Sequence, residues 1–387
     1  MPKTILYIHQ STELYGSDKT LHYLVSGINA NPDFNTIVIL PNEGPLKQLL
    51  ESHNIRVIVF PVIKISRSIF KPKALFSLPF LISKTTKNLR ALLDKEQIDI
   101  IHSNTLAVLL GAFYAKRYKI KHIWHIHEII KKPKIVSLVY PYLVNSLSKK
   151  VVFNSKASRD FLCKNNKGLA RKAIVNLNGM DRAIDFTSDL EKQQIRAKLF
   201  GVEDNDIVLA LVGRISKWKG QKLLLDAFNS LSEKHHNLKL VFVGSAPPNQ
   251  EYLVTELENE IKVSASSNSC KIIPFQENIW SIWDSIDIAV VPSLEPEPFG
   301  LVAVEAMLAK KPVFAANHGG LQEIVEHGKT GYFFEPNNSG DLALVIEKLL
   351  LDKTNLTGFG LKGYEKAVNN FSLERHVDQF VKLYKEV

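Results

Sequence analysis

The stretch Glu297-Pro298-Phe299-Gly300-Leu301-Val302-Ala303-Val304-Glu305 decides the fold of this chain. It follows an apolar run, Ile286–Val291, which ends at Pro292-Ser293 and is predicted to be a buried strand. Phe299–Leu308 is predicted to be a helix. Two glutamates therefore flank the point where a strand gives way to a helix, and ligands bind at that end of a strand in an open parallel sheet. The alternative is a surface helix that carries two solvated acids.

The length and composition describe an ordinary globular protein. A chain of 387 residues suggests two domains, possibly three. The two cysteines, Cys163 and Cys270, lie far apart and offer no disulfide or metal spacing, which fits a reducing cytosol. No apolar run approaches the roughly 18 residues that span a bilayer, so we expect a soluble, cytoplasmic protein.

The net charge of +10 is distributed unevenly along the chain. Residues 1–180 contain 27 Lys and Arg against 10 Asp and Glu, whereas residues 181–387 contain 22 against 29. The change of sign predicts a domain boundary near residue 180 and an anionic partner for the first half. Nucleic acid and an acidic membrane leaflet are the two candidates. No nucleic-acid module, zinc spacing or aromatic–basic motif favours the first, so no nucleic acid is expected.

One segment of the basic half, residues 63–90, is also apolar. A basic, amphipathic segment of this kind can lie at a membrane interface, and we expect contact with an anionic membrane here. The alternative is a helix pair that packs on its own sheet, and Pro72 and Pro79 are expected to break any long helix. The basic residues are Lys64, Arg67, Lys71, Lys73, Lys84, Lys87 and Arg90, and the apolar ones are Ile65, Ile69, Phe70, Leu75, Phe76, Leu78, Phe80, Leu81 and Ile82.

Predicted strands alternate with helical patterns in both halves of the chain, which indicates two α/β domains with Rossmann-like, doubly wound parallel sheets. The first domain is predicted at 1–180, the second at 181–370, and a link runs from Asn176 to about Ser188. The last helix, Leu373–Glu386 within 371–387, could pack back on the first domain. The strands expected are Ile5–Ile8, Thr36–Leu40, Val57–Phe60, Ile98–His102, His122–His127, Lys150–Asn154, Ile207–Val212, Lys239–Val243, Ile272–Pro274, Ile286–Val291, Pro312–Ala315 and Thr330–Phe334.

Two loops of the second half could bind an anion. Arg214 and Lys219 follow the strand Ile207–Val212, where two fixed cations could grip a diphosphate. Gly319 and Gly320 lie between a strand and a helix, where backbone N–H groups form an anion site. A solvated basic loop and an ordinary strand–helix turn are the alternatives. Together with the acidic pair, the loops indicate a nucleotide-diphosphate ligand.

The first half offers a second group of polar residues at predicted strand ends. Gly16-Ser17 closes the loop after the first strand. His125 and His127 share one face of a strand because side chains alternate, and Glu128 follows them. A histidine at the carboxyl end of a strand could hydrogen-bond a sugar hydroxyl, and Asn104 ends a neighbouring strand. The alternative for the histidine pair is one structural and one exposed histidine.

These segments together resemble the retaining, nucleotide-sugar-dependent glycosyltransferases of family 4, whose GT-B architecture has two Rossmann-like domains facing a cleft. The likeness is strongest over 212–336. Glu297 and Glu305 match that family's E-x7-E motif, which implies that Glu297 contacts the donor sugar and is catalytic, and that Glu305 binds the ribose. The same match implies donor contacts for Phe299, Gly300 and Leu301.

The basic and glycine loops resemble that family's other conserved segments. The resemblance implies that Arg214, Lys219, Gly16, Gly319 and Gly320 bind the diphosphate. His127-Glu128 sits where the family often has His-Asp, which implies that His127 contacts the donor near the reacting carbon. Asn104, His125 and Glu128 are then candidates for the acceptor. Three departures are Gly16-Ser17 in place of two glycines, Leu308-Ala309-Lys310 after the acidic motif, and Ser245-Ala246-Pro247-Pro248 in place of an acidic-glycine loop.

The resemblance implies transfer of a sugar, with retained configuration, from a nucleotide sugar to a glycan or lipid-linked acceptor in bacterial surface polysaccharide assembly at the inner face of the cytoplasmic membrane. No metal or other cofactor is expected, because Arg214 and Lys219 could replace a cation and no Asp-x-Asp cluster is placed to bind one. The alternatives are a soluble small-molecule acceptor and a non-catalytic scaffold. A dehydrogenase would need Gly-x-Gly-x-x-Gly directly after a strand, and none of the predicted strands is followed by that run.

Overall fold

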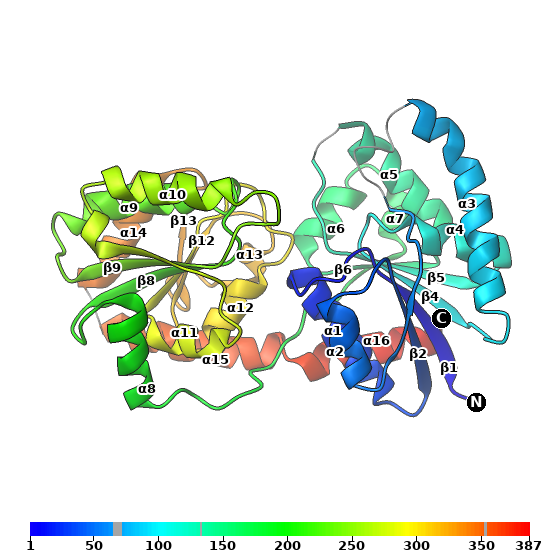
Figure 1. Ribbon diagram of the computed structural model, residues 1–387, viewed down its shortest axis with the longest axis horizontal. Helices are drawn as coiled ribbons and strands as arrows, with labels where there is room; N and C mark the ends of the chain where they lie inside the picture. Colours follow the sequence, from blue (N-terminus) through cyan, green and yellow to red (C-terminus); the bar gives the residue numbers. More distant parts are fainter. Residues whose placement is uncertain (65–71, 132–133, 352–353) are drawn as a thin grey trace. The chain divides into compact units, whose positions relative to one another are not determined.

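A computed structural model describes residues 1–64, 72–131, 134–351 and 354–387. The chain divides into two compact units, and each is described by itself here. Unit 1 comprises Met1–Met180 and Leu373–Val387, and unit 2 comprises Asp181–Ser372. Each unit is a wholly parallel sheet with helices on its faces (Figure 1). The predicted fold class of two Rossmann-like, doubly wound domains is confirmed.

Unit 1 has a seven-stranded sheet in the order β3-β2-β1-β4-β5-β6-β7. Its strands are β1 (Lys3–Ile8), β2 (Phe34–Leu40), β3 (Arg56–Val59), β4 (Ile100–Asn104), β5 (Lys121–Ile126), β6 (Lys150–Phe153) and β7 (Ala173–Val175). Its helices are α1 (Gly16–Asn29), α2 (Pro45–Ser52), α3 (Pro72–Leu92), α4 (Leu109–Tyr118), α5 (Lys134–Leu147), α6 (Lys156–Cys163), α7 (Lys167–Ala170) and α16 (Leu373–Glu386).

The central strands of unit 1 are buried on both faces because helices cover both. Along β1, Leu6 and Ile8 point into the core shared with α3, α4 and α5, whereas Ile5 and Tyr7 point into the core shared with α1 and α16. This alternation is the period-two geometry of a strand. It explains why the first strand reads as a nearly continuous apolar run.

The C-terminal helix α16 belongs to the second of these cores. Phe380 and Tyr384 are fully buried against the sheet. The Tyr384 hydroxyl lies 2.7 Å from Nδ1 of His102 and accepts a hydrogen bond of 3.1 Å from the Tyr7 hydroxyl. The last turns of the chain are thereby fixed to β1 and β4, over 280 residues away in sequence.

Helix α3 corrects one expectation about the basic, apolar segment. It runs without a break from Pro72 through Pro79 to Leu92, so the two prolines do not divide it. Pro72 occupies the first helical position, where the missing N–H costs nothing, and Pro79 is exposed, so the loss of one internal hydrogen bond is tolerated. The part of the segment at residues 65–71 lies outside the described residues.

Unit 2 has a six-stranded sheet in the order β10-β9-β8-β11-β12-β13. Its strands are β8 (Ile207–Val212), β9 (Leu238–Val243), β10 (Cys270–Ile273), β11 (Ile288–Val291), β12 (Val313–Ala316) and β13 (Gly331–Phe334). Its helices are α8 (Asp189–Gln194), α9 (Gln221–Ser232), α10 (Tyr252–Val263), α11 (Ile279–Ser285), α12 (Leu301–Leu308), α13 (Leu321–Ile324), α14 (Ser339–Leu351) and α15 (Thr354–Asn370), with a π-helical turn at Ile195–Phe200 and a 3₁₀ turn at Ser267–Ser269.

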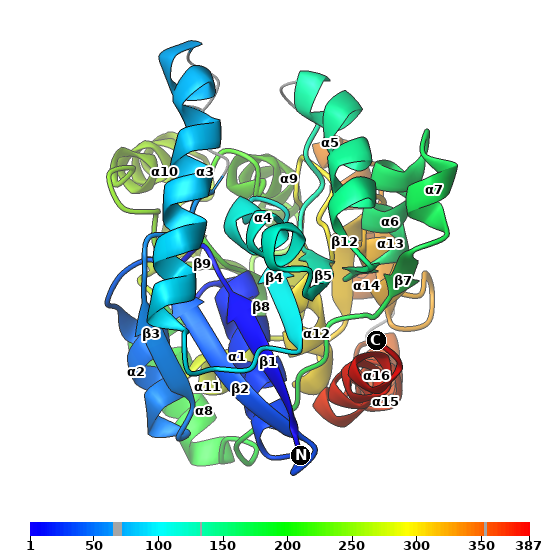
Figure 2. The same ribbon diagram turned by 90° about the vertical axis from the view of Figure 1, so that its right-hand side faces the viewer.

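In both sheets the order in which successive strands are added reverses once, and this reversal indicates where a ligand is expected to bind. In unit 1 the strand order turns at β1 and β4, and in unit 2 it turns at β8 and β11. A ligand site in a doubly wound sheet lies at the carboxyl ends of the strands at such a switch point. Figure 2 shows unit 1 from its side, with β1 and β4 next to each other.

The boundaries of several elements differ from those expected. The short strand β7 was not predicted, because three residues of strand propensity carry too little pattern. Helix α12 begins at Leu301 rather than Phe299, since Gly300 has a φ of 116° and forms its N-cap. Glu297 therefore lies in the loop before the helix.

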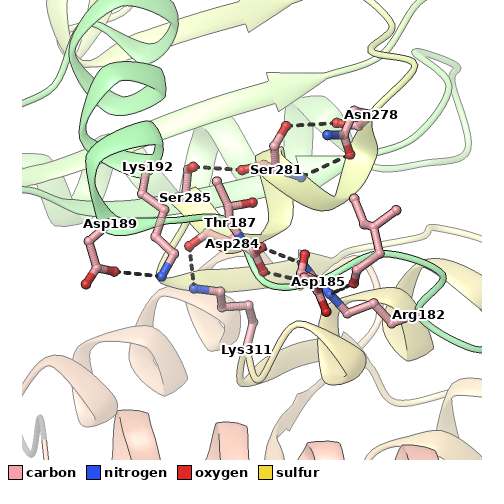
Figure 3. Close-up of polar contacts among 11 residues, drawn as sticks. Arg182, Asp185, Thr187, Asp189, Lys192, Asn278, Ser281, Asp284, Ser285 and Lys311 are labelled. Carbon is pink, nitrogen blue, oxygen red and sulfur yellow. Dashed lines mark hydrogen bonds and ion pairs between the residues drawn. The ribbon is translucent and has the colours of Figure 1, made fainter.

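The segment that enters unit 2 is fixed by a buried ion pair (Figure 3). Arg182 donates two hydrogen bonds to the Asp284 carboxylate, at 3.0 and 2.6 Å, and the same carboxylate accepts the Thr187 N–H at 2.8 Å. The Lys311 ammonium donates to the Asp284 carbonyl at 2.9 Å. Burial alone would raise the pKa of Asp284, but Arg182 and Thr187 outweigh it and hold that pKa below its ordinary value.

Candidate active site

Glu297 is the best-held acid at the switch point of unit 2. It lies in the loop after β11 and is 5% exposed. Its Oε1 accepts a hydrogen bond from the Ser293 hydroxyl at 2.6 Å and an ion-paired hydrogen bond from the Lys219 ammonium, also at 2.6 Å. Its carbonyl accepts the Gly320 N–H at 2.8 Å. Side chain and backbone are therefore fixed separately.

The loop after β8 supplies the cations. Lys219 reaches Glu297, and its ammonium lies 4.4 Å from the ring centroid of Trp218. Arg214 is exposed, and its carbonyl accepts a hydrogen bond from the Gln221 side chain at 2.9 Å. Arg214 and Lys219, the residues predicted to bind the diphosphate, thus lie in the expected loop. Lys219 contacts Glu297, the predicted catalytic acid.

The two glycines after β12 have a packing role that the sequence did not indicate. A Cβ at Gly319 would lie 2.4 Å from the carbonyl oxygen of Glu297, and one at Gly320 would lie 2.6 Å from Cα of Phe299. Gly319 also has a φ of 64°, in the left-handed region that favours glycine. The glycines let this loop lie directly against the backbone of the acidic loop, so phosphate binding is not needed to explain them.

Glu305 and Phe299 are buried, whereas the residues of a surface helix would be exposed. Glu305 is 7% exposed, and Trp283 of α11 donates its indole N–H to Oε2 at 3.3 Å. The Phe299 side chain is 2% exposed and packs edge-on against Phe371, with ring centroids 5.8 Å apart. Any donor contact of Phe299 would have to come through its backbone. Gly300 and Leu301 form the N-cap and first residue of α12.

Unit 1 brings its predicted polar residues together at the ends of β4 and β5. The Asn104 amide oxygen lies 2.9 Å from Nε2 of His127. The Glu128 carboxylate accepts the N–H groups of His127 and Leu106 at 3.0 and 2.9 Å. Burial lowers the pKa of His127 to about 3, with a smaller contribution from His9 and His376. His127 is therefore neutral at ordinary pH.

Desolvation also shifts the pKa of Glu128, and His125 is buried. Desolvation raises the pKa of Glu128 against the effect of its two backbone hydrogen bonds. His125 is 1% exposed, and its ring lies 5.0 Å from that of Phe380 on α16. Alternation does place His125 and His127 on one face of β5, but α16 covers that face over His125. This position does not support the predicted acceptor contact.

Gly16 is the first residue of α1, so its backbone lies at a helix N-terminus as the predicted diphosphate role requires. Among residues 1–64, 72–131, 134–351 and 354–387, no three His, Cys, Asp or Glu side chains gather in a way that could hold a metal ion. The expectation of a reaction without a metal stays a prediction. No helix in the described part of the chain has the length and apolar character needed to cross a membrane.

Two parallel α/β units, with an acid and a lysine paired at the switch point of the second, are typical of GT-B glycosyltransferases. Comparison with known proteins agrees. The model of glycosyltransferase family 4 matches residues 16–183, and the model of glycosyl transferases group 1 matches residues 191–366. The chain belongs to this family of glycosyltransferases.

Individual relatives are also named as sugar transferases. An uncharacterised glycosyltransferase of Methanocaldococcus jannaschii, MJ1607, is 30% identical over 54% of this chain and 53% of its own. The lipopolysaccharide 1,2-N-acetylglucosaminetransferase of Salmonella typhimurium is 35% identical over 42% of this chain and 44% of its own. The chain thus aligns with about half the length of these curated relatives.

A solved structure matches along nearly the whole chain. Anabaena Alr3699/HepE, crystallised with UDP and glucose, is 28% identical, covers 99% of both chains and superposes with a TM-score of 0.84.

Several residues that contact the predicted site residues of unit 1 and of unit 2 were not identified from the sequence. Ser293 and Trp283 hold the two glutamates of unit 2, and His9 and Asp18 extend the unit 1 group beyond Asn104. Ser293 was visible as the end of the strand run, since it directly follows Pro292. Trp283, His9 and Asp18 carry no local signal, because their partners are distant in sequence.

Proposed function

We propose that the protein transfers a sugar from a nucleotide-diphosphate donor to a hydroxyl group, with retained anomeric configuration. The observation that carries the proposal is the contact of Lys219 with Glu297 at the switch point of unit 2, in a chain of the family 4 glycosyltransferases. The relative crystallised with UDP and glucose makes a UDP-sugar the first donor to test. Unit 2 would bind the donor, and His127 is our candidate for a catalytic residue of unit 1.

The charges of unit 2 suit the departure of a diphosphate. Negative charge builds on the leaving group during transfer, and fixed cations and backbone N–H groups stabilise it without reorganisation. Arg214, Lys219 and the Gly319-Gly320 amides are our candidates in unit 2, and Gly16 is a separate candidate in unit 1. Lys219 is already ordered by Glu297, and it would bind the diphosphate while Glu297 turns to a sugar hydroxyl. We propose that no metal takes part.

The ribose and the sugar have separate candidates. Glu305, held by Trp283, is the candidate for the ribose hydroxyls. Glu297, with Gly300 and Leu301 at the start of α12, is the candidate for the donor sugar. Carboxylates are suited to both tasks because they accept hydrogen bonds from two hydroxyl groups at once.

Donor turnover by Lys219→Ala and Glu297→Ala tests these assignments. We expect each rate to fall roughly 100- to 1,000-fold, as when one charge-stabilising group is removed from an active site. The matched controls are Lys222→Ala and Glu295→Ala, which remove exposed charges close by in sequence. Rates like those of the unchanged protein in both test variants would rule the assignments out. A thermal-shift panel of nucleotide sugars selects the donor first.

We further propose a lipid-linked or glycan acceptor beside an anionic membrane, as in the assembly of bacterial surface polysaccharides. The name of the Salmonella relative supports the glycan, and apolar side chains on unit 1 support the membrane. The first turns of α3 and α5 project on the same side of unit 1 (Figures 1 and 2). The exposed apolar residues there are Phe76, Phe80, Leu81, Leu138, Val139 and Tyr142.

Co-sedimentation with vesicles tests the membrane contact. We expect binding to vesicles with anionic lipid at low salt and much weaker binding to vesicles of neutral lipid. Phe76→Ser with Phe80→Ser should reduce binding, because both rings are more than 70% exposed and contribute little to the core. The control is Phe275→Ser in unit 2, which removes an aromatic ring of 63% exposure. Unchanged binding by the double variant would exclude α3 as the contact.

A further inference from the structure

A chain of hydrogen bonds crosses the carboxyl ends of three neighbouring strands in unit 1. It begins at Asp18 in the first turn of α1, where Oδ1 lies 2.6 Å from Nε2 of His9. Nδ1 of His9 lies 3.0 Å from the Asn104 amide nitrogen, and the Asn104 amide oxygen lies 2.9 Å from Nε2 of His127. β1, β4 and β5 are adjacent in the sheet, so this hydrogen-bonded network lies along the switch point of unit 1.

The first three members are sealed from solvent. His9 and Asn104 are fully buried and Asp18 is 1% exposed, whereas His127 is 8% exposed. Buried polar groups in such a network hold one another in fixed orientations, because none can turn to water instead. The network therefore runs from a fully enclosed anchor to a histidine that is only slightly exposed.

Two members of the network are fixed by backbone contacts. Oδ2 of Asp18 accepts the Tyr15 N–H at 2.9 Å, which leaves Oδ1 facing His9. Next to Asn104, Thr105 has a φ of 90°, a strained value for a β-branched residue. Its N–H donates to the His125 carbonyl, and its own carbonyl accepts the Trp124 indole N–H, both at 2.8 Å. This clamp determines where the preceding side chain, Asn104, points.

We propose that Asp18, His9 and Asn104 are positioning residues that hold His127 in one tautomer, with the proton on Nε2 and the lone pair on Nδ1. A carboxylate only accepts, so His9 donates from Nε2, and its Nδ1 offers a lone pair to the Asn104 amide nitrogen 3.0 Å away. The Asn104 amide donates to that lone pair, and its oxygen accepts from Nε2 of His127. His127 then offers Nδ1 as an acceptor to a hydroxyl group of a sugar, a step that rests on the proposed function.

The opposite placement of the protons on His9 and His127 would use different hydrogen bonds. Nδ1 of His9 also lies 3.3 Å from the main-chain carbonyl oxygen of Asn104, a contact that becomes a hydrogen bond only if Nδ1 carries a proton. The Asn104 amide would then turn over and donate to Nε2 of His127, which would move the proton of His127 to Nδ1. The two arrangements give His127 opposite tautomers, so one measurement separates them.

Histidine tautomers are read directly by ¹⁵N NMR on the whole chain with ¹⁵N-labelled histidine. His127→Gln assigns the His127 signals by their loss. We expect protonated Nε2 and unprotonated Nδ1 in the unchanged protein, and averaged signals in Asn104→Leu and in His9→Phe. Ser103→Ala is the matched control, because it removes a buried hydrogen bond of 2.9 Å to a different histidine, His122, and leaves the His127 signals in place.

Two results would overturn the proposal. One is protonated Nδ1 in the unchanged protein. The other is an unchanged His127 spectrum in Asn104→Leu and His9→Phe, with native hydrogen exchange showing that both are folded. Donor turnover is measured alongside, and kcat should fall roughly tenfold in both variants with little change in KM. An unchanged kcat with altered tautomers would remove His127 from the proposed reaction and leave the network standing.

Discussion

The two units bury polar groups in opposite ways. Unit 2 buries charged pairs, Lys219 with Glu297 and Arg182 with Asp284, whose carboxylates are 7% and 1% exposed. Unit 1 buries histidines that stay neutral, among them His102, His125 and His376, and the burial lowers the pKa of each. Unit 2 thus pairs these buried acids with strong bases, whereas unit 1 keeps these buried histidines uncharged.

The difference determines what each unit tolerates. A buried charge is costly once its partner is removed, because the remaining ion keeps its desolvation penalty. A buried neutral histidine lowers the folding stability at acidic pH, because the unfolded chain binds a proton that the folded chain does not bind. Unit 2 should therefore be sensitive to substitution, and unit 1 to acid.

The largest expected effect is the loss of Arg182. Arg182→Met leaves the Asp284 carboxylate buried without its bidentate partner, and the free energy of unfolding should fall by about 3 kcal/mol. Hydrogen exchange of β11 and β12 during urea unfolding reports on unit 2 alone. The double variant Arg182→Met/Asp284→Leu should lose less than the single one, since no orphaned charge remains.

The control for this prediction is Lys222→Met. Lys222 pairs with Glu260 at 3.1 Å, but its side chain is 67% exposed, so the change should stay within about 0.5 kcal/mol. Equal losses in Lys222→Met and Arg182→Met would contradict the comparison, because burial would then make no difference to the pair.

The second expected effect is an acid sensitivity confined to unit 1. The pKa of His376 is lowered to about 4 by burial, from an ordinary value of 6.5. Between these values the unfolded chain holds the extra proton, so stability is complete above pH 6.5 and falls as the pH drops. His376 alone should account for about 1.6 kcal/mol between pH 6.5 and 5. Hydrogen exchange of β4 and β5 against pH measures it.

Two controls sharpen the acid prediction. In His376→Gln the slope of stability against pH should decrease in unit 1. Unit 2 should keep its protection over the same range, because the lowered pKa of Asp284 places its own loss below about pH 4. Equal loss of protection in β11 and β12 between pH 6.5 and 5 would contradict the division between the units.

The same contrast explains what the sequence could predict. The unit 2 site is largely local: Ser293, Glu297 and Glu305 lie within 13 residues on one strand–loop–helix unit, so spacing alone brought the acids to a strand end. The unit 1 network joins Asp18 and His9 to Asn104, and neither pattern nor propensity reports a contact over 95 residues. Only the sheet order, with β1 next to β4, creates it.

Burial by a distant helix is the other feature that spacing missed. The period of two correctly placed His125 and His127 on one face, but the cover over His125 comes from α16, more than 240 residues later in the chain. The packing role of two glycines was missed for a related reason. Gly319 and Gly320 contact the backbone of the Glu297 loop, and a close approach between two loops leaves no local trace.

The smallest expected effect concerns Glu305, which accepts a hydrogen bond from the neutral indole N–H of Trp283. Trp283 donates to Glu305 at 3.3 Å, so Trp283→Phe keeps the aromatic packing and removes one hydrogen bond. UDP affinity, measured by calorimetry, should fall roughly fivefold, equivalent to about 1 kcal/mol. In the double variant with Glu305→Gln, the two losses should be less than additive, because both changes weaken the same contact. A loss as large as that of Lys219→Ala would show that Glu305 depends on Trp283 as strongly as Glu297 depends on a cation, and the contrast between charged and neutral partners would not hold within unit 2.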